Sequence, residues 1–183
     1  MTLRSAAATN AADPTASFAD AMSTLASGVT LVTCRLDGRP WGMTVTAFAS
    51  VSAHPPTVLV SLRSDSPGAR AIAVTGAFGV SILSRDQTEI AEYGAAPGAP
   101  KFLEALVEPR DRVSVSPAIA GALAHLDCDV VRTLEEADHT VFFGRVRAAH
   151  RRWGGAPLIY HARGYRSFLA SKPTERNLRW VLS

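Results

Sequence analysis

Lysine and cysteine are scarce in this chain of 183 residues. Lys101 and Lys172 are its only lysines, so most of the 19 basic residues are scattered arginines, and the net charge is a mild +3. Without a basic block longer than Arg151-Arg152, the sequence does not support nucleic-acid binding. Cys34 and Cys128 stand far apart and match no metal-ligand spacing. They predict buried free thiols in a reducing cytoplasm and no metal site.

Long hydrophobic runs are also missing. No segment is long enough to cross a bilayer, and residues 1–12 have no apolar core of signal-peptide length. We therefore expect a cytoplasmic protein without membrane contact. No glycine-rich dinucleotide or phosphate-loop motif occurs, and no Ser/His/Asp or Cys/His arrangement stands out. With 47% hydrophobic residues, the chain fits a single domain over 1–183, with a disordered lead-in at 1–12 and a polar tail at 171–183.

Hydrophobic periodicity and turn residues predict a mainly β protein with short helices. A helix is expected to begin at Asp13-Pro14 and to end at Gly28. The Asp37-Gly38 pair predicts a tight hairpin turn. Strands are expected from residue 29 and over about 40–52, 57–63, 77–83, 111–115, 123–134, 140–150 and 157–168, with a loop over 95–109. Many short strands with few helices favour a closed or partly closed barrel.

Two short helices interrupt the predicted strands. Ser84 and Gln87 form a capping-box pair before a helix that ends at Gly94. Ser66 and Pro67 are typical of a helix start, and the predicted helix covers about 66–75. The unpaired amides of such a helix start attract phosphate, and Arg63 lies close enough to add a charge-assisted hydrogen bond. An ordinary capped helix beside a solvated arginine explains the same residues, and this alternative stays open.

Within residues 41–52, hydroxyl side chains fall on one parity and apolar or small ones on the other: Thr44, Thr46, Ser50 and Ser52 against Met43, Val45, Ala47, Ala49 and Val51. One wet face of a sheet explains this pattern most simply. Gly42 and Ala47, however, are small where a flat ring could approach the backbone closely. Together with the helix start after Arg63, the pattern indicates a phosphorylated planar cofactor, and we interpret that cofactor as a flavin.

Ordered motifs along most of the chain support this interpretation. The sequence resembles the short flavin reductases of two-component monooxygenases, a family with a split β-barrel fold of the FMN-binding type. The resemblance covers roughly Phe18 to Phe168. Its carriers are Gly28-Val29-Thr30, Val32-Thr33, the stretch 42–52, Pro55-Pro56, 58–62, 78–83, Lys101-Phe102, 126–128, Asp138-His139 and 143–146.

The resemblance implies an NAD(P)H-dependent flavin reductase. Such an enzyme transfers hydride from NADH or NADPH to FMN or FAD, and it supplies the reduced flavin to a separate monooxygenase. It works as a homodimer with the flavin near the subunit boundary. Because the cofactors carry the reactivity, no catalytic acid or base is expected.

The resemblance also assigns cofactor contacts. Thr44, Val45, Thr46 and Ala47 would line the flavin ring; Ser61, Leu62 and Arg63 would border the ring and the ribityl chain; Ser66, Pro67 and Gly68 would cradle the phosphate; Ser81 and Phe102 would complete the flavin side. His139 would lie beside the nicotinamide. Without the family pattern, His139 is more simply a surface turn residue.

Four positions depart from the family pattern. Thr46 stands where serine or asparagine is common, Ala47 where serine is common, Ser81 for asparagine, and Ala137 for the glycine of the Gly-Asp-His motif. These departures keep a second hypothesis open, a flavin-binding carrier or sensor without turnover. A pyridoxamine-phosphate-oxidase-like enzyme on the related barrel agrees less well with the motif series.

Overall fold

The structure is a computed structural model that describes residues 14–98, 100–108 and 116–167. The predicted lead-in at 1–12, the predicted strand at 111–115 and the tail at 171–183 lie outside the described residues. None of the helices in the described segments is long and apolar enough to cross a membrane.

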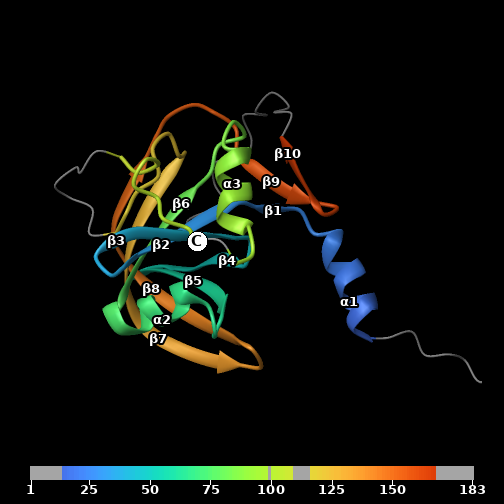
Figure 1. Cartoon of the computed structure of the whole chain (residues 1–183), viewed down its shortest axis with the longest axis horizontal. Coiled ribbons are helices and arrows are strands. Elements are labelled where there is room, and N and C mark those ends of the chain that lie inside the picture. Colours follow the sequence, from blue (N-terminus) through green and yellow to red (C-terminus); the bar gives the residue numbers. More distant parts are fainter. Residues whose placement is uncertain (1–13, 99, 109–115, 168–183) are drawn as a thin grey trace, which may run out of the picture.

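The main element is an antiparallel sheet of seven strands (Figure 1). Its strands are β2 (Thr30–Leu36), β3 (Arg39–Val45), β4 (Phe48–Ala53), β5 (Pro56–Arg63), β6 (Ala77–Ile82), β7 (Ala124–Glu136) and β8 (His139–Arg151), in the order β3-β2-β6-β7-β8-β5-β4. Asp37 and Gly38 both have positive φ, 52° and 74°, between β2 and β3. The predicted hairpin at this pair is therefore confirmed.

The two edge strands of this sheet, β3 and β4, follow each other in the chain with only Thr46 and Ala47 between them. Such a short link joins opposite edges only if the sheet curls into a barrel. The Ser61 amide donates to the Ala47 carbonyl at 3.0 Å, which ties the link to β5. The prediction of one strand over 40–52 is wrong, because the chain turns a barrel corner at 46–47.

A smaller sheet of three strands lies beside the barrel (Figure 1). It contains β1 (Ser27–Gly28), β9 (Leu158–His161) and β10 (Gly164–Ser167) in the order β1-β9-β10. The predicted strand over 157–168 is thus two strands, because Ala162 and Arg163 form a turn with positive φ. The first helix, α1 (Pro14–Ser23), ends before the predicted Gly28, which pairs in β1 instead.

The two remaining helices agree with their local signals to different degrees. α2 (Pro67–Thr75) has Ser66 as its N-cap, and Gly76 ends it in the left-handed conformation, as predicted. α3 (Thr88–Ala95) begins after the expected capping box. Only one half of that box forms, since the Gln87 side-chain oxygen accepts from the Ser84 amide at 3.0 Å.

Apolar side chains pack on both faces of the curled sheet. The barrel interior holds Phe78, Phe142 and Val60 together with Ile72 of α2. A second cluster lies under α3 and the neighbouring segments and contains Leu31, Leu83, Leu103 and Leu158. Cys34 and Cys128 are buried free thiols, as predicted, and burial raises the pKa of each to about 12. The mainly β prediction with short helices is confirmed.

Candidate cofactor site

Five of the predicted contact residues converge at one rim of the barrel. Arg63, the last residue of β5, pairs in register with His139, the first residue of β8. The helix α2 begins four residues after Arg63, behind its cap Ser66. At the neighbouring corner, Ala47 accepts the amide hydrogen bond of Ser61. Strand pairing and the short link to α2 therefore bring together Ala47, Ser61, Arg63, Ser66 and His139.

The start of α2 is suited to hold a phosphate. The Ser66 hydroxyl accepts from the Ala69 amide at 3.1 Å, and Pro67 has no N–H to satisfy. The Gly68 amide belongs to the first turn, whose N–H groups have no acceptor inside a helix. Gly68 lies against Trp41, and a Cβ at this position would stand 2.4 Å from the Trp41 ring atom Cζ3. The close approach of α2 to β3 at this point therefore requires glycine.

Carboxylates surround the arginine of this rim. The Arg63 Nε and Nη2 atoms donate to Asp65 at 3.0 and 2.9 Å, and Asp138 lies 3.9 Å from Nη1. The hydrogen bond to Asp65 raises the pKa of Arg63. Asp138 also lies 2.7 Å from His139 Nδ1, and that hydrogen bond lowers the pKa of the Asp138 carboxyl. A phosphate at Arg63 would replace carboxylate partners rather than water alone.

The residues expected around the flavin ring differ in what they present. The Thr44 hydroxyl donates to the Ala91 carbonyl of α3 at 2.6 Å, so it faces the helix. The side chains of Val45 and Leu62 are buried in the barrel interior. Thr46 and Ala47 are exposed at the corner. Thr44, Val45 and Leu62 are therefore limited to backbone contacts or to shaping the wall, and all five ring-side assignments remain predictions.

Ser81 is not brought to this group. It is fully buried on the sheet face that residues 116–122 cover, where its hydroxyl accepts from the Ile119 amide and lies 3.0 Å from His125 Nδ1. Phe102, by contrast, extends the β3 edge opposite Trp41, and the Arg39 guanidinium stacks 3.6 Å from its ring centre. The Tyr93 hydroxyl of α3 donates to the Phe102 carbonyl at 2.9 Å, so Phe102 lies between the β3 edge and α3.

Two residues at the rim were not among the predicted contacts. Asp65 accepts hydrogen bonds from Nε and Nη2 of Arg63, and Thr140 Oγ1 lies 2.8 Å from Ser64 Oγ. The spacing Arg63-Ser64-Asp65 carries a local signal, since residues two apart in a turn readily pair. Thr140 gives no such signal, because only the β5–β8 pairing brings it near Ser64.

The donor set suits a phosphorylated ligand, with first-turn amides, a hydroxyl and a guanidinium at one rim. A curled antiparallel barrel that offers such a rim belongs to the class of cofactor-binding β-barrels. The profile of the flavin reductase like domain matches residues 22–169, so this chain belongs to that family. The predicted family is confirmed.

Curated relatives and a solved structure agree with this assignment. The chain is 37% identical over 165 residues to the reductase component of 4-nitrophenol 4-monooxygenase/4-nitrocatechol 2-monooxygenase of Rhodococcus opacus, covering 90% of this chain and 85% of that one. It is 38% identical to an NADH-dependent flavin reductase of a Rhodococcus species, covering 80% and 82%. An NADH:FAD oxidoreductase of Streptomyces globisporus, solved with NAD and FAD fragments, superimposes with a TM-score of 0.80 at 29% identity, covering 87% and 96%. The predicted split-barrel fold is confirmed.

Proposed function

We propose that this protein is an NAD(P)H-dependent flavin reductase that supplies reduced flavin to a separate monooxygenase. The family match over residues 22–169 supports the reaction class. The observation that carries the proposal is the pairing of Arg63 with His139 beside the start of α2. It puts the residue expected at the nicotinamide next to the residues expected at the flavin.

The residues of this chain bind and orient, and bound flavin supplies the hydride acceptor. Ser66 and the Gly68 amide hold the phosphate, and Arg63 adds positive charge beside it. The corner at Thr46 and Ala47 borders the ring with small side chains. His139, held by Asp138 at 2.7 Å, lines the place of the nicotinamide. Alignment of two bound rings is itself a large contribution to the rate, so no acid or base is needed.

The test mixes the purified protein with NADH or NADPH and with free FMN or FAD, and follows the nicotinamide absorbance. We expect rapid nicotinamide oxidation that depends on added flavin, and weak, exchangeable flavin binding. Flavin retained through gel filtration without nicotinamide oxidation would instead identify a carrier. Failure of all four combinations would end the reductase proposal.

The bound portion is expected to be the FMN part of either flavin. The predicted contacts at the barrel rim beside α2 bind a ring, a ribityl chain and one phosphate. FMN and FAD share these three parts. No predicted contact residue is assigned to an adenine. We therefore expect similar affinities for FMN and FAD, measured by fluorescence titration. A much higher affinity for FAD than for FMN would mean that the site also contacts the adenine.

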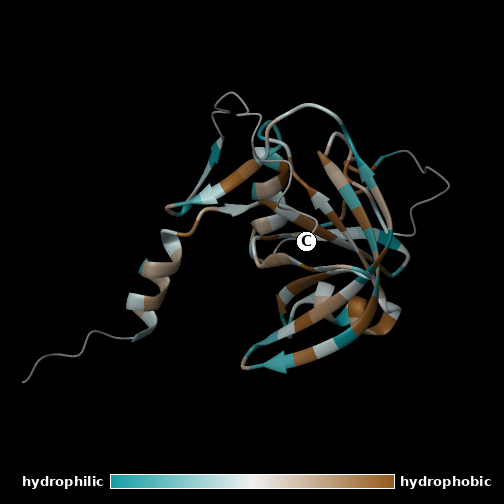
Figure 2. Cartoon of the chain, turned by 180° about the vertical axis from the view of Figure 1, so that it is seen from behind, coloured by the Kyte–Doolittle hydropathy of each residue, from teal (hydrophilic) through white to brown (hydrophobic). Residues whose placement is uncertain are grey.

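We also propose that the protein is a homodimer in the cytoplasm. The α1 helix extends to one side of the barrel and has no buried residue (Figures 1 and 2). Phe18, Met22 and Leu25 are 66%, 46% and 56% exposed, and a second copy of the chain would cover them. Light scattering should give the mass of a dimer for the native chain, and the Phe18→Ser/Met22→Ser variant should shift toward monomer. A native monomer would contradict the proposal. The two free thiols support a reducing compartment.

A further inference from the structure

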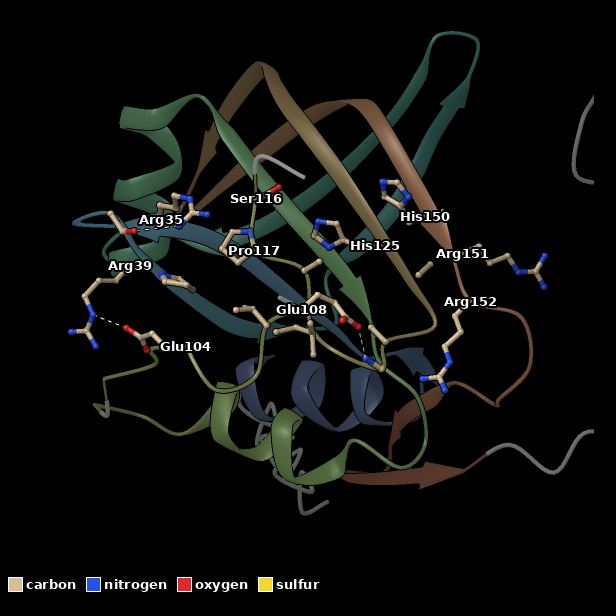
Figure 3. A pocket seen from close by; sticks show the side chains of 18 residues that line it. Arg35, Arg39, Glu104, Glu108, Ser116, Pro117, His125, His150, Arg151 and Arg152 are labelled. Atoms are coloured by element: carbon tan, nitrogen blue, oxygen red, sulfur yellow. Dashed lines mark hydrogen bonds and ion pairs between the residues drawn. The ribbon is translucent and has the colours of Figure 1, made fainter. Parts of the chain in front are cut away.

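A cavity of about 590 Å³ lies away from the cofactor rim (Figure 3). It is bounded by the turn between β2 and β3, by residues 104–108 and 116–124, and by the end of β8. His139 begins β8, and Arg151, at the cavity, ends it. The 13 residues of β8, at about 3.3 Å each, separate the two by roughly 40 Å along the strand. The volume of the cavity is in the range of small-molecule sites, about 300–1,000 Å³.

The cavity wall contains a buried ring nitrogen without a hydrogen-bond partner. His125 is only 5% exposed, and its Nε2 atom has no hydrogen-bond partner within the described residues. Its Nδ1 lies 3.0 Å from the Ser81 hydroxyl, which already accepts from the Ile119 amide. The Ser81 hydroxyl has one proton and a second lone pair, so it can pair with Nδ1 in either tautomer, and the ring can carry its own proton on Nε2. Burial lowers the pKa of His125 to about 4, so the ring is neutral at pH 7.

The rim of the cavity carries an excess of positive charge. Arg35, Arg39, Arg151 and Arg152 contribute to its lining, against two carboxylates. Both carboxylates are occupied: Glu104 accepts from Arg39 at 2.7 Å, and Glu108 accepts from the Gly121 amide at 3.2 Å (Figure 3). Among the described residues, Arg35, Arg151 and Arg152 form no ion pair. Arg35 donates to the Gly38 carbonyl at 3.2 Å, and Arg151 stacks 4.2 Å from the Trp153 ring centre. Arg152 is therefore the guanidinium most available to an anion.

We propose that this cavity is a second ligand site, which binds an organic anion with an apolar, ring-sized body. Ile119 and Pro117 provide apolar wall, and Arg152 at the rim receives the anionic group. The neutral His125 ring can carry its proton on Nε2 and donate it to an acceptor oxygen of the ligand, which removes the cost of a buried, unpaired nitrogen. The site does not depend on the proposed reductase activity, because none of its residues belongs to the cofactor rim.

The experiment titrates the native protein with naphthoate by calorimetry and repeats the titration with the neutral naphthalenemethanol. We expect naphthoate to bind at one site per chain in the presence of saturating FMN, and naphthalenemethanol to bind far more weakly. Arg152→Gln should weaken naphthoate binding by roughly tenfold, because it removes a charge-assisted contact. The matched control Arg132→Gln makes the same charge change on β7, outside the cavity lining, and should leave the affinity unchanged.

A second variant tests the buried, unpaired nitrogen of His125. His125→Phe keeps a ring of similar size and removes both nitrogens, so it should also weaken naphthoate binding; if this variant fails to fold, Arg152→Gln still decides. The proposal is overturned if naphthoate does not bind, if FMN displaces it, or if Arg132→Gln weakens binding as much as Arg152→Gln. Nicotinamide oxidation is measured separately, so either proposal can fail while the other stands.

Discussion

Arg63 and His139 stand opposite each other on β5 and β8, and the Asp138 carboxylate contacts both. Asp65 holds the same guanidinium from the other side. The cation and the histidine of the rim are therefore placed by two neighbouring carboxylates. These acids orient Arg63, and they also oppose an anionic ligand at the same spot.

Removing the Asp65 carboxylate should strengthen flavin binding. In Asp65→Asn, Arg63 keeps a hydrogen-bonding neighbour but loses a competing negative charge, so the flavin dissociation constant should fall about two- to fivefold, the scale of an exposed ion pair. Fluorescence quenching of FMN gives the constant. The effect should shrink at high salt, because exposed charges are screened.

The control for this prediction is Asp86→Asn, an exposed acid that pairs with Arg85 elsewhere on the barrel and should not change the constant. Arg63→Ala provides the opposite arm and should weaken binding by tenfold or more, as expected for loss of a charge-assisted contact. Weaker binding in Asp65→Asn would mean that Asp65 acts mainly by positioning Arg63.

Substitution of His139 should affect the nicotinamide more than the flavin. His139→Ala removes a ring held by Asp138, and we expect KM for NADH to rise roughly fivefold, equivalent to one ordinary hydrogen bond. KM for flavin should change little. Steady-state kinetics with each substrate varied in turn separates the two, and His161→Ala on β9 is the matched control. A change confined to KM for flavin would mean that His139 contacts the flavin and not the nicotinamide.

Local signals predicted those parts of the fold that local chemistry determines. Asp37-Gly38 forms its hairpin because both residues adopt positive φ, and α2 begins and ends at its capping residues. The corner at Thr46 and Ala47 was missed because closure of the barrel, and not the local sequence, interrupts the strand there. The alternation of hydroxyl and apolar residues is interrupted only at Phe48, directly after the corner, and resumes at Ser50.

The candidate site shows the same division. The sequence placed Arg63 beside Ser66 through simple proximity along the chain. It did not show that Ser81 lies beside His125, because that contact depends on the register of β6 against β7. Nor did it show that carboxylates already bind Arg63. The Asp65 contact has a local signal in its spacing from Arg63, whereas the Asp138 contact depends on the register of β5 against β8.

Ala137 occupies a position that suits glycine. Its φ is 51°, in the left-handed region that costs a non-glycine residue about 1 kcal/mol or more. In Ala137→Gly, relief of this strain offsets the greater entropy of glycine in the unfolded chain, so the free energy of unfolding should change little. Ala149→Gly, at an exposed β8 position with ordinary φ, should cost about 0.5–1 kcal/mol. Denaturant unfolding compares the two, and equal losses would show that the turn at Ala137 is unstrained.

Gly68 should not tolerate even one added methyl group. Alanine is the better helix former, but its Cβ would stand 2.4 and 3.0 Å from two atoms of the Trp41 ring, which is itself buried. Gly68→Ala should therefore destabilise the protein by about 1–3 kcal/mol, the usual cost of overpacking. It should also weaken flavin binding, because α2 must move away from β3 and take its first-turn amides with it.

The control for this substitution is Gly28→Ala, where an added Cβ meets nothing within 4 Å, so unfolding and flavin binding should both stay near the native values. Trp41→Phe in the Gly68→Ala background removes the second ring of the indole and should restore part of the lost stability. Thermal unfolding and FMN titration of the four proteins measure both effects. If Gly68→Ala proved as stable as the native chain, α2 would have freedom to shift, and close contact with Trp41 would not be what positions the phosphate site.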